Sequence, residues 1–286
     1  MSLTSGDFNA DGKTDIAVGA SYYSSYTGRA YIFYNGSIIT ENASGADIII
    51  TGEASSYFGT SIISGDWNAD GKADLAVGAY GYSSFAGRAY LFYNGSIITE
   101  NASGADIIIT GETTDNYLGY TIGSGDWNAD GKTDLVVGAY GYSTNTGRAY
   151  LFYNGSIITE NASGADIIIT GEASSSFSIS LTSGDFNFDG KADIAVGAAD
   201  YSSSKGRAYI FYNGSIITEN ASGADILITG ETTSHRFGYS LASDDFNADG
   251  KTDLAVGAYS YSTSTGRDYI FYNGSIITEN ASGRWA

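Results

Sequence analysis

Apolar residues along this chain come in short runs that are separated by small and polar residues. In one representative stretch the runs are Gly59–Ser64, Asp74–Ala79, Arg88–Tyr93 and Ala105–Thr110. Each run is rich in β-branched or aromatic residues and is bounded by Gly, Asn, Asp or Ser, which is typical of β-strands. No segment shows a sustained helical period with capping residues. The pattern therefore predicts an all-β protein whose unit has four short antiparallel strands.

The same runs return at a nearly constant interval. The string Asp-aromatic-Asn-x-Asp-Gly-Lys begins at Asp7, Asp66, Asp126, Asp185 and Asp245, so the intervals are 59, 60, 59 and 60 residues. Such self-similarity is the signature of a repeat architecture. We predict a single domain over residues 1–286, with repeats at approximately 1–53, 54–112, 113–172, 173–231 and 232–286.

The third run of each repeat indicates how the sheets are stacked. In the second repeat Ala89 and Leu91 point to one face and Tyr90 and Phe92 to the other, so both faces are apolar. A strand of this kind must be covered on both sides. Radial stacking of four-stranded sheets meets that requirement, and we predict a β-propeller of five four-stranded antiparallel blades. A linear β-solenoid is the alternative, although a repeat of about 60 residues is long for its coils.

The last repeat departs from the other four. After a third run that ends near Tyr272, the sequence ASGRWA replaces the fourth run, so the chain encodes 19 predicted strands. The last blade is therefore predicted to lack its outer strand, and an open sheet edge invites pairing with another chain. We expect either a closed five-bladed monomer with one thin blade or an oligomer that self-associates through this edge.

Two short motifs connect the repeats to a known family. An aromatic or leucine residue precedes Gly at Phe58-Gly59, Leu118-Gly119 and Phe237-Gly238, and the fourth repeat has Phe177-Ser178 instead. A Gly-Ala pair ends the second run of every repeat, without the proline that usually follows it. The units resemble the FG-GAP repeat, the blade of the integrin α-subunit propeller and of related bacterial repeats and fungal integrin-like lectins. The resemblance implies a β-propeller with calcium in the loop between the first two strands of each blade, although the family ring usually has more than five blades.

An acidic loop carries the strongest chemical signal. Every repeat contains D-x-N-x-D-G-x-x-D, in which alternate side-chain oxygens turn inward around a glycine bend, as hard cations require. The closing acid stands at position nine and no helical pattern flanks the loop, so this is not an EF-hand. The alternative is plain turn chemistry, but five intact copies favour metal binding. We predict about one Ca²⁺ per repeat, with these ligands: Asp7, Asn9, Asp11, Lys13, Asp15, Asp66, Asn68, Asp70, Lys72, Asp74, Asp126, Asn128, Asp130, Lys132, Asp134, Asp185, Asn187, Asp189, Lys191, Asp193, Asp245, Asn247, Asp249, Lys251 and Asp253.

The lysines in that set are expected to offer a backbone carbonyl, with the side chain directed to solvent or to a carboxylate. The chain has 32 acidic residues against 13 Lys and Arg, a formal charge of −19. Five divalent ions would change the charge from −19 to −19 + 10 = −9. A surface this acidic excludes a binder of duplex nucleic acid, which needs a basic footprint. Magnesium is less favoured than calcium because it tends to keep its waters.

The face opposite the acidic loops is the predicted ligand face. It carries the loops between the second and third strands (21–27, 80–86, 140–146, 199–205 and 259–265) and the connections between repeats, all rich in Tyr and Ser. Such loops combine flat apolar area with adaptable hydrogen bonds. Tyr26, Phe85, Asn145 and Lys205 vary between repeats and are ligand candidates. The tyrosines that recur are expected mainly to pack between blades, and the arginines that open the third strand to pair with carboxylates: Tyr23, Tyr82, Tyr142, Tyr201, Tyr261, Arg29, Arg88, Arg148, Arg207 and Arg267.

Composition excludes several classes of function. There is no cysteine, which excludes a thiolate centre, and the single histidine, His235, argues strongly against a Ser-His-Asp triad or a multi-histidine metal site. No apolar run is long enough for a membrane span, and we expect no membrane insertion and see no signal peptide. The leading hypothesis is a calcium-binding, non-catalytic recognition or adhesion module, extracellular or at the cell surface, that binds a protein or, as a multivalent lectin, a glycan. The alternative is a structural scaffold, engineered or recently amplified, without a ligand of its own.

Overall fold

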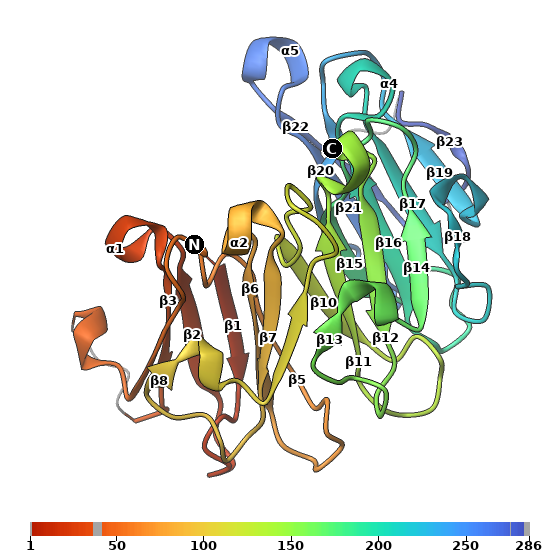
Figure 1. The fold of residues 1–286 in the computed structure, drawn as a ribbon. Helices are drawn as coiled ribbons and strands as arrows, with labels where there is room; N and C mark the ends of the chain where they lie inside the picture. Colours follow the sequence, from red (N-terminus) through yellow and green to blue (C-terminus); the bar gives the residue numbers. More distant parts are fainter. Residues whose placement is uncertain (1, 37–41, 275, 283–286) are drawn as a thin grey trace. The chain divides into compact units, whose positions relative to one another are not determined.

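The structure is a computed structural model, and it describes residues 2–36, 42–274 and 276–282. It is all-β, with five sheets of three to five strands (Figure 1). By their internal contacts the residues divide into two compact units. Unit 1 comprises Met1–Ser124, Lys132–Val137 and Phe152–Ala165, and unit 2 comprises Gly125–Gly131, Gly138–Leu151 and Asp166–Ala286. The third repeat thus contributes to both units, and the assignment of 1–286 to one domain stays a prediction.

The four predicted strands are present in each of the first four repeats. The first strands are β1 (Ser2–Gly6), β5 (Ile62–Gly65), β10 (Thr121–Gly125), β15 (Phe177–Gly184) and β20 (Phe237–Asp244). The second strands are β2 (Asp15–Ala20), β6 (Asp74–Ala79), β11 (Asp134–Ala139), β16 (Asp193–Ala198) and β21 (Asp253–Ala258). The third strands are β3 (Arg29–Phe33), β7 (Arg88–Phe92), β12 (Arg148–Phe152), β17 (Arg207–Phe211) and β22 (Arg267–Phe271). The fourth strands are β4 (Ile48–Thr51), β9 (Ile107–Thr110), β14 (Ile167–Thr170) and β19 (Ile226–Thr229).

The sheet of each of these four repeats also contains a fifth strand, which comes from the following repeat and which the sequence pattern did not predict. The two-residue strands are β8 (Glu100–Asn101), β13 (Glu160–Asn161), β18 (Glu219–Asn220) and β23 (Glu279–Asn280). Each pairs in parallel with the fourth strand of the preceding repeat; β8 pairs with β4 and β23 with β19. Every repeat after the first therefore hydrogen-bonds to the sheet before it.

The cores lie between the sheets of consecutive repeats. In unit 1 one apolar cluster joins Ile32 and Ile50 of the first sheet to Leu75 and Tyr90 of the second. In unit 2 another joins Ala208 and Ile228 of the fourth repeat to Leu254 of the fifth. Strand β7 is buried on both faces, as its sequence predicted. Burial on both faces confirms the stacking of sheets on sheets.

Short helical turns connect the second and third strands. They are α1 (Tyr23–Tyr26), α2 (Tyr82–Phe85), α3 (Tyr142–Asn145), α4 (Tyr201–Ser204) and α5 (Tyr261–Ser264), and single 3₁₀ turns lie at η1 (Ala43–Gly45), η2 (Ala102–Gly104), η3 (Ala162–Gly164) and η4 (Ala221–Gly223). Inside α2, Ser83 and Ser84 have φ of 48° and 54°, so the turn is left-handed there. In unit 1, α1 and α2 lie at the end of their sheets opposite the loops that join the first and second strands (Figure 1).

The fifth repeat forms a sheet of only three described strands, β20, β21 and β22. Phe246 in this repeat is 42% exposed, whereas its equivalents Phe8, Trp67, Trp127 and Phe186 are at most 2% exposed. The residues that replace the fourth run were predicted at 281–286, and of these 283–286 lie outside the described part of the chain. Among the described residues, the last blade, which was predicted to lack its outer strand, is a three-stranded sheet.

Candidate functional site

The acidic loops lie where the sequence placed them, between the first and second strands. In the second repeat the carboxylate of Asp66 accepts hydrogen bonds from the backbone N–H groups of Asp70 and Gly71, at 3.0 and 2.8 Å. The Asn68 side chain accepts a second bond from Asp70 N–H at 2.9 Å, and Asp70 accepts one from Lys72 N–H at 3.0 Å. The first, fourth and fifth repeats make the same bonds. The loop therefore holds its oxygens in a fixed bend.

The closing aspartate of each loop is buried. Asp74 is fully buried at the start of β6, where it accepts hydrogen bonds from the backbone N–H groups of Trp67 at 3.0 Å and Asn94 at 2.7 Å. Burial raises the pKa of Asp74 to about 6, and the charges of Asp70 and Asp66 act in the same direction while the two N–H groups oppose them. Burial likewise raises the pKa of Asp193 to about 6. An ionised carboxylate at this position is costly without further positive charge.

The side chains of the predicted ligands are engaged mainly with the loop backbone. Within the described ranges, no three or more His, Cys, Asp or Glu side chains are grouped so as to hold a metal ion. The lysines at the seventh position donate their backbone N–H to the loop, and the Lys251 ammonium lies 4.9 Å from the centre of the Phe188 ring. The donor set is chemically suited to a hard cation because it consists of oxygens, but the ligand assignment stays a prediction.

An asparagine that the sequence analysis did not single out links the acidic loops of consecutive repeats. The Asn94 side chain donates from Nδ2 to the Phe8 carbonyl oxygen at 2.9 Å, and Asn154 donates in the same way to Trp67 at 2.9 Å. In unit 2, Asn273 donates to Phe186 at 3.1 Å. The acidic loops of the first, second and fourth repeats are thereby braced by the repeat that follows each of them. The sequence feature that could have indicated this contact is the Asn-Gly-Ser segment, which is the same in every repeat but by itself predicts only a turn.

On the opposite face, Arg88, Arg207 and Arg267 pair with carboxylates, as predicted, whereas each recurring tyrosine stacks on the arginine of its own repeat rather than between repeats. The Arg88 guanidinium lies 3.6 Å from the centre of the Tyr82 ring, and the other four repeats have the same stack at 3.7–3.9 Å. Arg88 also pairs with Glu53 of the preceding repeat at 2.7 Å, and the buried Tyr90 hydroxyl donates to the same carboxylate oxygen at 2.7 Å. Arg207, Glu172 and Tyr209 repeat this arrangement. These groups hold neighbouring repeats together.

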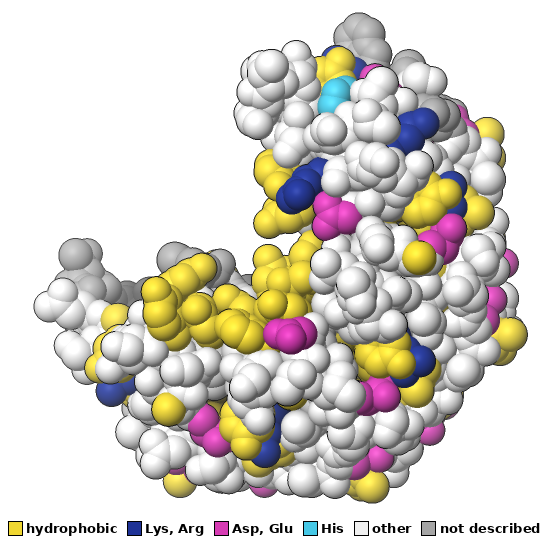
Figure 2. Space-filling model, turned by 45° about the horizontal axis from the view of Figure 1, so that its top comes forward, with side chains coloured by type: hydrophobic (Ala, Val, Ile, Leu, Met, Phe, Trp, Pro, Cys, Tyr) yellow, Lys and Arg dark blue, Asp and Glu magenta, His cyan; other side chains and the backbone are white. Residues whose placement is uncertain are grey.

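Other aromatic residues of this face gather in unit 1 into one group, which we call the aromatic cluster: Tyr22, Tyr26, Tyr57, Tyr80, Phe85, Tyr117 and Tyr120. The Tyr57 ring stacks between Tyr26 and Tyr80, with 4.7 Å between ring centres on each side. Phe85 continues the contacts to Tyr117 at 5.1 Å. Tyr22 is 71% and Tyr26 46% exposed, and Figure 2 shows hydrophobic side chains in a band over the loops of the N-terminal repeats. An open cavity of about 300 Å³ adjoins Tyr22, Tyr80 and Tyr120.

The equivalent loops of the fourth and fifth repeats, in unit 2, make polar contacts. Asp200 accepts a hydrogen bond from Ser176 Oγ at 2.7 Å and lies 3.4 Å from Arg236 Nε. Tyr239 and Tyr259 form a ring pair with 4.4 Å between centres, and the Arg236 guanidinium donates a hydrogen bond to the Tyr259 hydroxyl. Of the predicted ligand candidates, Tyr26 and Phe85 both contact Tyr57, while Asn145 and Lys205 belong to unit 2. The sequence analysis missed Tyr57 and Tyr117 as site residues, although both lie in the connections it assigned to this face.

Comparison with known families identifies the repeats. The model described as "FG-GAP repeat" matches residues 1–33, 58–92 and 237–271, and the one described as "FG-GAP-like repeat" matches residues 126–196. The chain belongs to the FG-GAP repeat family. The matches in the second and fifth repeats begin at Phe58 and Phe237, which carried the resemblance in the sequence.

The relatives of this FG-GAP chain are larger proteins. It is 32% identical to Drosophila melanogaster "Integrin alpha-PS2" over 81% of this chain and 17% of that protein. It is 32% identical to Gallus gallus "Integrin alpha-6" over 75% of this chain and 20% of that protein. It is 34% identical to Bos taurus "Phosphatidylinositol-glycan-specific phospholipase D" over 49% of this chain and 18% of that protein. The chain thus spans about a fifth or less of these relatives' lengths. None of the helices in the described residues is long and apolar enough to cross a membrane.

Proposed function

We propose that this FG-GAP chain is a calcium-binding, non-catalytic recognition or adhesion module that acts outside the cell or at its surface. The observation that carries the proposal is the aromatic cluster, which presents exposed tyrosine rings on loops of a rigid sheet scaffold. Two integrin relatives that match most of the chain support an adhesive role. The phospholipase D relative matches over only half of this chain, and we propose that the shared repeats are not its catalytic part.

Calcium is the cation that the acidic loops fit best. Each loop offers several hard oxygens within nine residues, and burial raises the pKa of the closing aspartates Asp74 and Asp193, which a nearby cation would offset. The loop bend is already held by backbone hydrogen bonds, so binding would require side chains to turn rather than the chain to refold. We propose Asp66, Asn68, Asp70, the Lys72 carbonyl and Asp74, and their equivalents, as ligands.

Melting curves test the calcium part of the proposal. Because an ion that binds only the folded chain stabilises it by mass action, a chelator should lower the melting temperature and added calcium should restore it. Trp67 and Trp127 lie inside acidic loops and are buried, so their fluorescence should respond to the titration. Magnesium at equal concentration is the control and should restore less. A melting curve that neither chelator nor calcium shifts would contradict calcium binding.

We further propose that the aromatic cluster binds a glycan. Flat aromatic faces suit the apolar faces of sugar rings, and the Ser and Thr residues around the adjoining cavity supply hydroxyl partners. Tyr22 and Tyr26 are exposed enough to receive a ligand, and the stack continues from Tyr26 through Tyr57 to Tyr80. Only unit 1 carries the cluster among the described residues, so the proposal is one dominant site rather than five equal ones.

A glycan array with single substitutions tests this site. Tyr26→Ala and Tyr22→Ala should each reduce binding at least tenfold, since each removes an exposed ring. Tyr239→Ala is the matched control, because Tyr239 is 39% exposed but lies in unit 2 outside the cluster. Equal loss for all three variants would argue against a site at the cluster. A chain that binds neither glycans nor proteins and is unusually stable would favour the alternative, a structural scaffold.

A further inference from the structure

The loops that form the aromatic cluster contain a single charged residue. They are residues 21–27, 54–58, 80–86 and 113–120, and Asp115 is the only Asp, Glu, Lys, Arg or His among them. Asp115 is exposed, and within the described part of the chain its carboxylate has no hydrogen bond and no ion pair. Its backbone N–H donates to the Ser84 carbonyl oxygen at 3.1 Å, and the Tyr117 N–H donates to that of Phe85 at 2.8 Å. These bonds hold Asp115 beside two residues of the cluster.

Two arginines open third strands on the same face of unit 1, and both are engaged outside the cluster. Arg88 pairs with Glu53 at 2.7 Å, so its charge is compensated. Arg29 donates from Nε to Thr51 Oγ1 at 3.2 Å, and its guanidinium lies 3.9 Å from the centre of the Tyr23 ring. The cluster therefore has a negative group of its own and no positive one in its loops.

The rings next to Asp115 are packed against one another and are half-buried. Tyr80, Phe85 and Tyr117 contact each other with 5.1–6.2 Å between ring centres, and Tyr120 meets Tyr80 edge-on at 5.5 Å. The face of an aromatic ring carries a partial negative charge and attracts a cation. Ring faces and an uncompensated carboxylate thus favour the same kind of ligand group, a cation.

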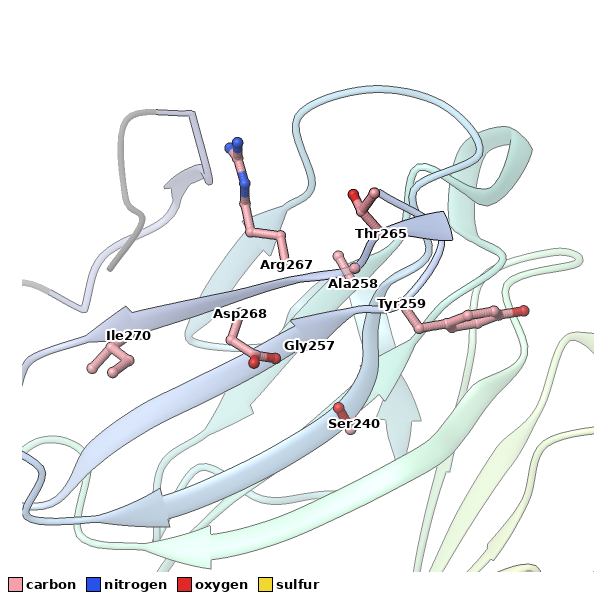
Figure 3. Close-up of a pocket in the computed structure, with 9 residues that line it drawn as sticks. Ser240, Gly257, Ala258, Tyr259, Thr265, Arg267, Asp268 and Ile270 are labelled. Atoms are coloured by element: carbon pink, nitrogen blue, oxygen red, sulfur yellow. The ribbon is translucent and has the colours of Figure 1, made fainter. Parts of the chain in front are cut away.

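The fifth repeat shows a cation on the equivalent ring. Tyr259 stands there in the place of Tyr80, and Arg236 stands in the place of Tyr57. The Arg236 guanidinium lies 5.6 Å from the centre of the Tyr259 ring and donates a hydrogen bond to its hydroxyl. Arg267 of the same repeat points in a different direction from Tyr259 (Figure 3). In unit 2 the chain itself thus supplies a cation to this ring position, whereas the loops of the cluster in unit 1 contain none.

We propose that the glycan bound at the aromatic cluster carries unsubstituted amino groups, which are protonated to ammonium. This inference rests on the proposed glycan-binding function and adds the chemical class of the sugar. The sugar rings stack on the exposed tyrosines, and an ammonium group lies against the ring faces of Tyr80 and Tyr117 and pairs with Asp115. Glycans with carboxylate or sulfate groups are disfavoured, because Asp115 and the formal charge of −19 repel them.

Two matched glycans test the proposal. A short oligomer of glucosamine and the N-acetylated oligomer of the same length share one backbone and differ in whether the nitrogen is charged. Calorimetry with the full chain, at a pH that protonates the amino groups, should show the glucosamine oligomer binding about tenfold more tightly, since cation–π attraction and an ion pair both add affinity. Equal or tighter binding of the N-acetylated oligomer would overturn this inference and leave glycan binding intact. Binding of neither oligomer, together with a blank glycan array, would overturn both.

Moving one carboxylate separates a local effect from that of the overall charge. Asp115→Ser introduces the residue found at the equivalent positions 55, 174 and 234, all of which have the same positive φ. Ser174→Asp places an aspartate at that position in unit 2, and the double variant keeps the formal charge at −19. Asp115→Ser should reduce the preference for the glucosamine oligomer about threefold, and the double variant should not regain it. Full recovery in the double variant would assign the preference to overall charge and overturn the proposal.

A pair of substitutions at Tyr117 tests the aromatic part. Tyr117→Phe keeps the ring face and should keep the preference, whereas Tyr117→Leu keeps apolar volume without a ring face and should reduce the preference about threefold. Melting curves that match the original chain confirm that both variants are folded. A preference that neither Tyr117→Leu nor Asp115→Ser changes would place the ammonium elsewhere and overturn the proposal.

Discussion

Left-handed residues other than glycine recur at the same positions of each repeat. The fourth residue of the acidic loop has φ between 57° and 61° in all five copies, at Ala10, Ala69, Ala129, Phe188 and Ala248. The ligand-face loops contribute more, such as Ser83, Ser84 and Phe85. This conformation costs an L-residue about 1–2 kcal/mol relative to its right-handed one. Its concentration in the two candidate binding faces fits the rule that strain is stored where structure serves a function.

Glycine at one of these positions should therefore stabilise the fold. We expect Ala69→Gly to raise the free energy of unfolding by about 1 kcal/mol, because glycine adopts positive φ without a Cβ clash. Urea unfolding followed by tryptophan fluorescence measures the change. Ala76→Gly, at a fully buried position of β6, is the control and should destabilise. A destabilised Ala69→Gly variant would show that this loop is not strained.

The buried closing aspartates make a prediction about pH for the metal-free protein. The pKa of Asp74 and of Asp193 is raised to about 6 in the folded state, from 3.8, so the folded chain binds more protons than the unfolded chain between these values. Their contribution to stability is then fully present below about pH 4 and is lost as the pH rises through 6. Melting of the chelated protein should show this loss between pH 5 and 7. Asp74→Asn should reduce it, and a pH dependence that Asp74→Asn leaves unchanged would assign the effect to other groups.

Among the elements, the short apolar runs with turn residues between them identified the four main strands of the second repeat to within three residues. The two-residue strands such as β8 were missed because Glu-Asn has no strand signal of its own, and its pairing with β4 depends on the preceding repeat. The left-handed turns of α1 to α5 were missed because Ser and Thr are not residues from which a positive φ is predicted. The position of the acidic loops followed from the motif alone, whereas their bracing by Asn94 required the packing of one repeat on the next.

The bracing asparagine can be tested as a contact between elements. Asn94→Ala should lower the free energy of unfolding by about 1–2 kcal/mol, since the buried carbonyl of Phe8 loses its donor. The backbone N–H of residue 94 still reaches Asp74, so the acidic loop itself is kept. Asn101→Ala in the same repeat is the matched control, because Asn101 is exposed and its side chain makes no capping hydrogen bond. Equal effects of the two substitutions would contradict a bracing role.

Over the whole molecule, the sequence placed the tyrosine-rich loops on one face but did not show that those of unit 1 would form a cluster. Tyr57 and Tyr80 belong to loops whose distance depends on how consecutive sheets pack, and that packing has no local signal. The charge, by contrast, follows from composition alone. A formal charge of −19 on a folded chain of 286 residues is self-repulsive, and the acidic loops concentrate that repulsion.

The repulsion gives the metal-free and calcium-loaded chains different responses to salt. Sodium chloride screens like charges, with a Debye length of about 10 Å at 0.1 M, so raising the salt concentration should increase the melting temperature of the chelated chain. If five calcium ions bind, the formal charge falls from −19 to −19 + 10 = −9, and the carboxylates that repel most strongly are neutralised locally. The salt-induced increase in melting temperature should then be clearly smaller with calcium than with chelator. Melting curves at about 20 to 300 mM sodium chloride measure it, because the Debye length shortens strongly over this range. Equal increases in both series would mean that bound ions do not neutralise the charge of the acidic loops. That result would contradict calcium binding at these loops even if calcium shifted the melting temperature slightly.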